Sequence, residues 1–297
     1  MIDDAQLAAI ARDCRVQIIR MLTHAGSGHP GGSLSVIDLV TTLLFQRMRH
    51  DPARPDWPDR DRLILSKGHA VPALYAAMAR AGYFPPDRLI TLRKLGSPLQ
   101  GHPDRTALPG IEAATGSLGQ GLSIAVGMAL GLRASGSPAR VYCIMGDGEI
   151  QEGQVWEAAM AAPELGQPDH PLDNLTVIVD ENRIQLDDFV AKVRDVEPLS
   201  AKWKAFRWPV IEIDGHDVGQ IRKALDEAEA TRGTPTLVIA HTVKGKGVSF
   251  MENVVDWHGK APKPAEAVQA IREILGVSDT DTAMGALVDE LRALEKK

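Results

Sequence analysis

The chain has 297 residues, of which 44% are hydrophobic and 24% charged, as is ordinary for a globular protein. Its 33 Lys and Arg against 39 Asp and Glu give a net charge of −6, which argues against a nucleic-acid-binding protein. The two cysteines, Cys14 and Cys143, exclude a disulfide scaffold and a cysteine-rich zinc module, and they favour a reducing cytoplasm. The N-terminus is acidic and mixed, and no apolar run approaches 18 residues, so neither a targeting segment nor a membrane span is expected.

Hydrophobic periodicity predicts a first helix over 3–23 and a second over 35–47, with a glycine-rich loop between them. A surface loop rich in Pro and Asp follows over 51–61. Beyond it, short apolar strands alternate with helices. We expect strands over 62–66, 140–145, 175–180, 210–214 and 236–241, and helices over 70–81, 118–134, 152–165, 199–205 and 218–231. The last stretch, 263–297, is expected to be helical, polar and peripheral.

The alternation of β-branched strands with helices predicts an α/β fold, a doubly wound and mainly parallel sheet with helices on both faces. No internal repeat or low-complexity linker divides the chain, so we interpret residues 1–297 as a single domain. In such sheets ligands bind at the carboxyl ends of the strands. The loops at those ends are therefore the candidates for chemistry.

Glycine-rich loops follow three of the predicted strands, and a fourth glycine cluster opens a helix. They lie at 67–70, 146–148, 243–247 and 116–121. Glycines at these places let backbone N–H groups approach an anion, although tight turns between strand and helix would give the same composition.

Asp147 and Asn182 follow two strands that are consecutive in the sequence. Asp147 lies between two glycines, where its carboxylate can reach a hard cation. An Asp carboxylate, an amide oxygen and a nearby backbone carbonyl would form half of an octahedral Mg²⁺ site. The alternative is that Asp147 caps the next helix and Asn182 occupies a turn.

Four histidines lie beside glycines: His29, His69, His102 and His258. A lone histidine is usually structural, but four on glycine-containing loops indicate a polar site that binds hydroxyls and transfers protons near neutral pH. No zinc-ligand spacing such as HxxxH or CxxC is present. Glu152 and Glu157 follow the Asp147 loop. The simpler interpretation of these two residues is that they are exposed to solvent or interact with the dipole at the N-terminus of the helix. His216 is expected in a turn, with Asp217 capping the next helix.

Other catalytic and nucleotide-binding motifs are absent from the sequence. There is no GxxxxGK[ST] phosphate loop and no GxSxG turn, and neither cysteine has a neighbouring histidine. The glycines of 116–121 have the spacing GxxGxG rather than GxGxxG. Nucleophilic Ser or Cys catalysis and dinucleotide binding therefore have no support.

Seven ordered motifs resemble transketolase over about residues 10–262: GHPGGSLSVIDL, LSKGHA, GHPD, GSLGQGL, GDGEIQEGQVWEA, Asn182 and DWHGKAP. The resemblance implies the thiamine diphosphate-binding fold, and within it the domain that binds the diphosphate. A full-length transketolase is well over twice as long. The chain therefore resembles the N-terminal subunit of a split transketolase, whose C-terminal subunit supplies the pyrimidine-binding domain.

The resemblance also implies an activity. Transketolases use thiamine diphosphate and Mg²⁺ to transfer a two-carbon ketol unit from a ketose phosphate to an aldose or aldose phosphate. For this chain it implies a sugar-phosphate substrate of the pentose phosphate pathway, a cytoplasmic location and an α2β2 heterotetramer. The pyrimidine-binding domain would be absent here, so we expect the chain alone to be inactive.

The resemblance assigns roles to individual residues. It implies Mg²⁺ binding by Asp147, Asn182 and the carbonyl of Ile184. The implied cofactor contacts are His69, Gly116, Ser117, Leu118, Gly146, Asp147, Gly148, Glu152, Asn182, Ile184 and Leu186, with the two leucines beside the thiazolium ring. The implied catalytic residues are the substrate-channel histidines and two glutamates of a network across the dimer interface: His29, His69, His102, His258, Glu152 and Glu157.

Three alternatives remain open. A related thiamine diphosphate enzyme, such as a modified-sugar transketolase, deoxyxylulose-phosphate synthase or a 2-oxoacid dehydrogenase α subunit, could carry similar cofactor motifs. The paired GHP motifs and the WHG segment favour transketolase, because they suit polyhydroxylated substrates. A non-catalytic regulatory subunit would be expected to have lost some of the site residues. The missing phosphate motifs disfavour a nucleotide-binding regulator.

Overall fold

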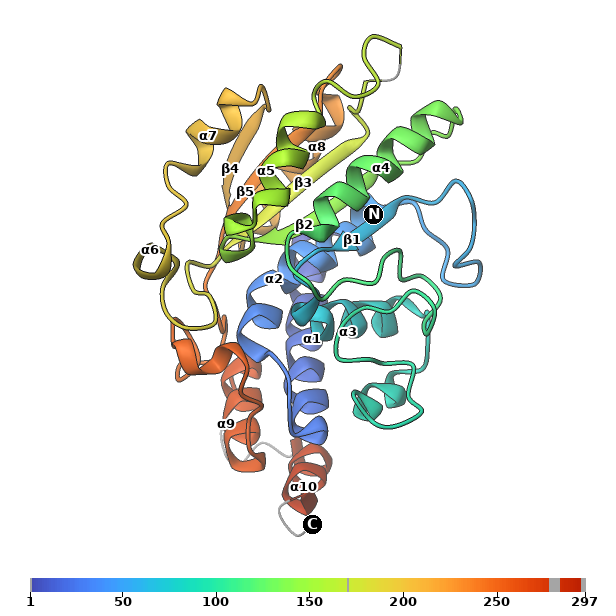
Figure 1. Ribbon diagram of the computed structural model, residues 1–297. Helices are drawn as coiled ribbons and strands as arrows, with labels where there is room; N and C mark the ends of the chain where they lie inside the picture. The colour runs from blue at the N-terminus through green and yellow to red at the C-terminus, as the bar shows by residue number, and fades with distance from the viewer. Residues whose placement is uncertain (1, 170, 278–283, 295–297) are drawn as a thin grey trace.

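The computed structural model of the protein describes residues 2–169, 171–277 and 284–294. Its centre is a five-stranded sheet, parallel throughout, with the strand order β1-β2-β3-β5-β4 (Figure 1). The strands are β1 Arg62–Leu65, β2 Val141–Gly146, β3 Leu175–Glu181, β4 Val210–Asp214 and β5 Thr236–His241. The predicted α/β fold is confirmed, and each predicted strand agrees with an observed one to within a residue at either end.

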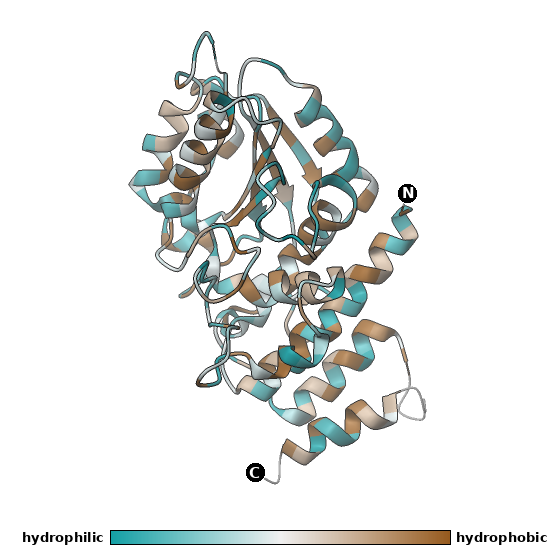
Figure 2. Ribbon diagram, turned by 90° about the vertical axis from the view of Figure 1, so that its right-hand side faces the viewer, coloured by the Kyte–Doolittle hydropathy of each residue, from teal (hydrophilic) through white to brown (hydrophobic). Residues whose placement is uncertain are grey.

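Helices cover both faces of the sheet, and each face has its own hydrophobic core. One core joins the sheet to α1 (Asp4–Ala25), α2 (Pro30–Thr42), α3 (Val71–Ala81) and α8 (Val218–Ala230). The other joins it to α4 (Gln120–Ala134), α5 (Gly153–Ala161), α6 (Val190–Val193) and α7 (Leu199–Ala205). Successive residues of β3 alternate between the cores: Ile178 belongs to the first, and Val177 and Val179 to the second. The strands are accordingly largely hydrophobic, whereas the helices mix both kinds of residue (Figure 2).

The second helix begins earlier than predicted, at Pro30 rather than near residue 35. Proline suits a first helical turn, because its fixed φ is helical and its missing N–H has no partner there. The glycines that follow are part of this helix and not of a loop. A Cβ on Gly31 would lie 2.9 Å from the carbonyl oxygen of Trp257, so the helix approaches a neighbouring loop too closely for a side chain.

The predicted helix over 152–165 is shorter than expected. A 3₁₀ turn occupies Gly148–Gln151, and α5 ends at Ala161. Pro163 explains the end, because it has no N–H with which to continue the helical hydrogen bonds.

The C-terminal segment 263–297 contains α9 (Pro264–Leu275) and α10 (Gly285–Ala293), while residues 278–283 and 295–297 lie outside the described part of the chain. Both helices pack beside α1, away from the sheet (Figure 1). Ile271 is buried on the inner face of α9, and Arg20 on α1 pairs with Glu290 on α10. Among the described residues, no helix combines the length and apolarity that crossing a bilayer requires.

Candidate active site

The carboxyl ends of β2 and β3 meet at one edge of the sheet. The two strands are neighbours, and Gly146 is in register with Asp180. Asp147 and Asn182 therefore lie on adjacent strand ends, as the sequence predicts. A cavity of about 230 Å³ opens over them. The predicted site residues that line it are His69, Leu118, Gly146, Asp147, Gly148, Glu152, Asn182, Ile184, Leu186 and His258.

The four histidines singled out from the sequence form one cluster. The ring centre of His29 lies 5.3 Å from that of His69, 5.6 Å from that of His258 and 6.3 Å from that of His102. The buried Nδ1 of His29 has no hydrogen-bond partner in the described part of the protein. An unsatisfied ring nitrogen at the centre of such a cluster is suited to bind a polar ligand.

Burial keeps these histidines neutral. Burial, and then the nearby charged groups, lowers the pKa of His29 to about 4 and that of His258 to about 3. The groups that face His29 are Arg93, Lys67, Lys244, His69, His102 and His258. A neutral imidazole has one donor and one acceptor nitrogen, so the cluster can both receive and supply protons at substrate hydroxyls.

The low pKa of His29 makes stability depend on pH. The unfolded chain binds a proton at this residue near pH 6.5 and the folded chain only near pH 4, so stability falls as the pH falls through this range. Between pH 7 and pH 5, we expect the free energy of unfolding of the His29→Asn variant to fall by about 2 kcal/mol less than that of the wild type. Urea unfolding at the two pH values measures this difference. Equal losses in the two proteins would contradict the burial argument.

Asp147 is a buried carboxylate without an ion pair among the described residues. It accepts hydrogen bonds from the backbone N–H of Gly148 at 2.8 Å and of Arg183 at 2.5 Å. Burial, and then the charge of Asp180, raises the pKa of Asp147 to about 7. The carboxylate of Asp147 is therefore a buried negative charge that a bound cation would offset.

The turn after β3 shapes the rest of this centre. Arg183 has a φ of 66°, in the left-handed region that side chains rarely adopt. This turn brings the Oδ1 atom of Asn182 within 3.2 Å of the N–H of Ile184, from which it accepts a hydrogen bond. Carboxylate, amide and carbonyl oxygens are hard donors, and they fit Mg²⁺. In the described part of the chain, no group of three His, Cys, Asp or Glu side chains could hold a metal ion instead.

Lys244 is a site residue that sequence reasoning missed. Its Nζ donates a hydrogen bond to the carbonyl of Ile184 at 2.7 Å and lies 2.7 Å from Nδ1 of His258. Burial, and then the charge of Lys67, lowers the pKa of Lys244 to about 7. The lysine thus links the predicted metal centre to the histidine cluster. In the sequence, the feature that could have indicated a role for Lys244 in the site is its position in the glycine-rich loop 243–247.

Asp180 and Lys67 form a buried ion pair that the sequence analysis also missed. Asp180 accepts further hydrogen bonds from Ser35 at 2.6 Å and from Thr242 at 2.5 Å. Burial alone would raise the pKa of Asp180, but Lys67 and the hydrogen bonds hold it below its ordinary value. The carboxylate joins α2 to the loops after β1 and β5 and so fixes the floor of the site.

Two further residues position the loops. The buried carboxylate of Glu149 accepts hydrogen bonds from Ser66 and from the N–H groups of Gly119 at 2.9 Å and Gly146 at 3.0 Å, and so ties three loops together. His216 donates from Nδ1 to Asp38 at 2.8 Å and accepts at Nε2 from the N–H of Val243 at 2.9 Å.

His216 therefore holds the loop that carries Lys244, a role that its expected place in a turn did not reveal. The predicted cap at Asp217 is confirmed, since its side chain accepts the N–H of Gln220.

Some predicted residues lie outside the cavity lining or at its margin. Gly116 and Ser117 are exposed, with Gly116 beside the ring of His102. Glu157 is exposed on α5, on the outer surface of the domain, and Glu152 is exposed at the cavity rim. Leu186 is 63% exposed although it lines the cavity.

The parallel sheet, with an oxygen-donor turn and a histidine cluster over its carboxyl edge, defines a cofactor-binding α/β domain. The family model described as "Transketolase, thiamine diphosphate binding domain" matches residues 7–291. The chain belongs to the transketolase family, as its thiamine diphosphate-binding domain.

Similar proteins fall into two groups. Over 249 residues the chain is 45% identical to the 6-deoxy-6-sulfo-D-fructose transketolase subunit SqwG of Clostridium sp. (strain MSTE9), covering 82% of this chain and 89% of that one. It is 39% identical to an apulose-4-phosphate transketolase subunit of Phocaeicola vulgatus, covering 88% and 90%. The transketolase structure from Leishmania mexicana matches with a TM-score of 0.85 at 32% identity, covering 98% of this chain but 45% of that one. The chain thus spans a little under half the length of the solved transketolases that it matches.

Proposed function

We propose that the chain is the diphosphate-binding subunit of a two-chain transketolase that depends on thiamine diphosphate and Mg²⁺. The complex would transfer a two-carbon ketol unit from a ketose phosphate to an aldose, in the cytoplasm. The observation that carries the proposal is the neutral histidine cluster beside an oxygen-donor turn at one sheet edge. The relatives that are named as transketolase subunits support a second chain.

The residues of this chain would act as follows. Asp147, Asn182 and the carbonyl of Ile184 would hold Mg²⁺, and His69 with the loops at Gly116–Leu118 and Gly146–Gly148 would bind the diphosphate. When bound, thiamine diphosphate supplies the nucleophilic carbon that accepts the ketol unit. Leu118 and Leu186 would exclude water beside its ring.

The histidine cluster would bind the substrate's hydroxyls. His29, His102 and His258 are neutral and near one another, so one ring can accept the proton of the donor C3 hydroxyl while another donates to the acceptor oxygen. Glu152 and Glu157 are exposed in this chain. We propose that they meet a second chain, in an α2β2 assembly that completes the site with a pyrimidine-binding domain.

Two classes of sugar are candidates for the donor substrate of this enzyme. The similarity to relatives named for a sulfo-sugar and for apulose 4-phosphate favours a modified-sugar transketolase over one of the pentose phosphate pathway. A panel of donors containing xylulose 5-phosphate, 6-deoxy-6-sulfofructose and apulose 4-phosphate, with ribose 5-phosphate and glyceraldehyde 3-phosphate as acceptors, distinguishes the two. The preferred donor is the one with the highest kcat/KM.

The two-chain proposal predicts that the purified chain has no ketol-transfer activity alone. A tagged chain recovered from its native host should carry one second chain, and the complex should show activity that requires thiamine diphosphate and Mg²⁺. The Asp147→Ala variant is the control for assembly: it should be recovered with the same second chain, but the complex should have no activity. Ketol transfer by the pure single chain would refute the two-chain proposal, whereas a complex with bound cofactor and no transfer from any donor would refute the reaction.

A further inference from the structure

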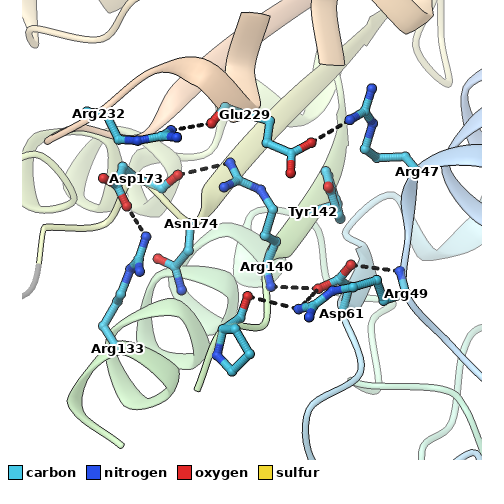
Figure 3. A pocket seen from close by; sticks show the side chains of 11 residues that line it. Arg47, Arg49, Asp61, Arg133, Arg140, Tyr142, Asp173, Asn174, Glu229 and Arg232 are labelled. Atoms are coloured by element: carbon cyan, nitrogen blue, oxygen red, sulfur yellow. Dashed lines mark hydrogen bonds and ion pairs between the residues drawn. The ribbon is translucent and has the colours of Figure 1, made fainter. Parts of the chain in front are cut away.

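A second and larger cavity lies at the opposite edge of the sheet. Its volume is about 670 Å³, and Figure 3 shows the side chains that line it. Arg140 directly precedes β2 and Asn174 directly precedes β3, so the cavity opens at the amino ends of these strands. The candidate active site follows their carboxyl ends. The seven residues of β3 separate the two by about 20 Å.

The lining of this cavity carries an excess of positive charge. Five arginines line it: Arg47, Arg49, Arg133, Arg140 and Arg232. Three carboxylates face them, from Asp61, Asp173 and Glu229. A fourth carboxylate, that of Asp226, pairs with Arg47 from outside the lining, so five positive groups meet four negative ones in a chain whose net charge is −6. Guanidinium groups that gather in this way attract anions.

Three of the five arginines pair with carboxylates. Arg133 pairs with Asp173, Arg47 with both Glu229 and Asp226, and Arg49 with Asp61. Neither of the other two has a carboxylate partner among the described residues.

Within the described ranges, the side chain of Arg140 donates only to backbone carbonyls, those of Asp173 at 2.9 Å and Ala228 at 3.4 Å. Arg232 likewise donates to the carbonyls of Glu229 and Thr231. Figure 3 shows Arg140 in the middle of the lining.

The hydrogen bonds to carbonyl groups explain where the side chains of Arg140 and Arg232 lie, but they do not neutralise the two positive charges. Ala228 and Glu229 lie in the last turn of α8, where the partial negative charge of a helix end favours a cation. That partial charge is smaller than a carboxylate's. In addition, Nε of Arg140 and Oδ1 of Asn174 are buried without a hydrogen-bond partner in the described part of the chain. Buried polar atoms of this kind usually have a partner, which a ligand could supply.

We propose that this cavity binds a small phosphorylated metabolite, at a site separate from the cofactor's. A guanidinium donates two parallel hydrogen bonds to a phosphate, which makes arginine the residue of choice for this group. The volume lies in the range of pockets that enclose a whole small molecule and exceeds what one inorganic ion would fill. Arg140 and Arg232 are the residues that would bind its phosphate.

Calorimetric titration with pyrophosphate in the presence of EDTA tests the proposal. Wild type, the double variant Arg140→Gln/Arg232→Gln and two controls are compared. Arg54→Gln changes an exposed arginine whose ion pair is with Asp51, and Lys244→Gln changes the cation of the candidate active site. We expect pyrophosphate to bind the wild type and both controls with similar affinity. The double variant should bind at least tenfold more weakly.

Folding of each variant is checked by its melting temperature without ligand. If the double variant does not fold, Arg232→Gln alone decides, because this side chain is exposed and donates to carbonyls at its own helix end, and it should weaken binding at least threefold. Binding that is lost in Lys244→Gln but kept in the arginine variants would place the anion in the active site and overturn the proposal. Absence of any pyrophosphate binding by the wild type would overturn it as well.

Discussion

The variant Asp147→Ala is expected to reduce Mg²⁺-dependent binding of thiamine diphosphate by at least about 100-fold, because loss of residues that merely support metal ligands already costs 10–100-fold. Of the three proposed Mg²⁺ ligands, Asp147 is the charged one, and its carboxylate also accepts hydrogen bonds from the N–H groups of Gly148 and of Arg183 in the turn after β3. Removing it eliminates both the negative charge and the anchor of the turn.

The carboxylate charge of Asp147 should contribute little to the stability of the metal-free protein. The carboxylate of Asp147 is buried near Asp180 and has no ion pair among the described residues, so its charge opposes folding. The variant Asp147→Asn removes this charge but also one of the two oxygens that accept the N–H groups of Gly148 and Arg183, so we expect its free energy of unfolding without metal to differ from that of the wild type by less than about 1 kcal/mol, although it binds the cofactor poorly.

Calorimetric titration with thiamine diphosphate at saturating Mg²⁺, paired with urea unfolding in EDTA, measures both effects. Asp187→Asn, at an exposed position of the turn after β3, is the matched control and should change neither. Undiminished cofactor binding by Asp147→Ala would remove this residue from the metal centre. A large loss of stability in Asp147→Asn would show that its carboxylate serves the fold instead.

Sequence patterns predicted the fold well because its determinants are local. The central strands β2, β3 and β5 are largely apolar runs, and such a run specifies a buried parallel strand directly. The order of consecutive strands β2 and β3 then placed Asp147 near Asn182 without any knowledge of the loops between them. The early start of α2 was missed because glycines suggested a loop, whereas their small size serves a close approach to Trp257.

The supporting residues of the site could not be predicted in the same way, because their roles depend on which loops converge. Lys67 and Asp180 are separated by 113 positions, and nothing local distinguishes their pairing from an exposed lysine and a strand-end aspartate. Lys244 reaches Ile184 across 60 positions. The histidines were easier to single out, because each lies beside a glycine, but their mutual distances became known only from the fold.

The variant Lys67→Met is expected to lower the free energy of unfolding by about 3–5 kcal/mol, the cost of leaving one partner of a buried ion pair alone. The side chain of Lys67 is 2% exposed and that of Asp180 is fully buried, so water cannot replace the lost partner. The hydrogen bonds from Ser35 and Thr242 remain, but neutral donors do not offset a full charge in the interior.

Urea unfolding at pH 7 measures this loss, and Lys192→Met is the matched control. Lys192 pairs with Asp188 on the surface, where the two side chains are 65% and 39% exposed, so its removal should cost less than about 1 kcal/mol. The double variant Lys67→Met/Asp180→Asn removes both charges and should recover part of the stability that Lys67→Met loses, because the penalty arises from the unpaired carboxylate and not from the missing lysine stem. A loss below about 1 kcal/mol in Lys67→Met, or no recovery in the double variant, would mean that water or another cation reaches Asp180 and that the ion pair does not hold the floor of the site together.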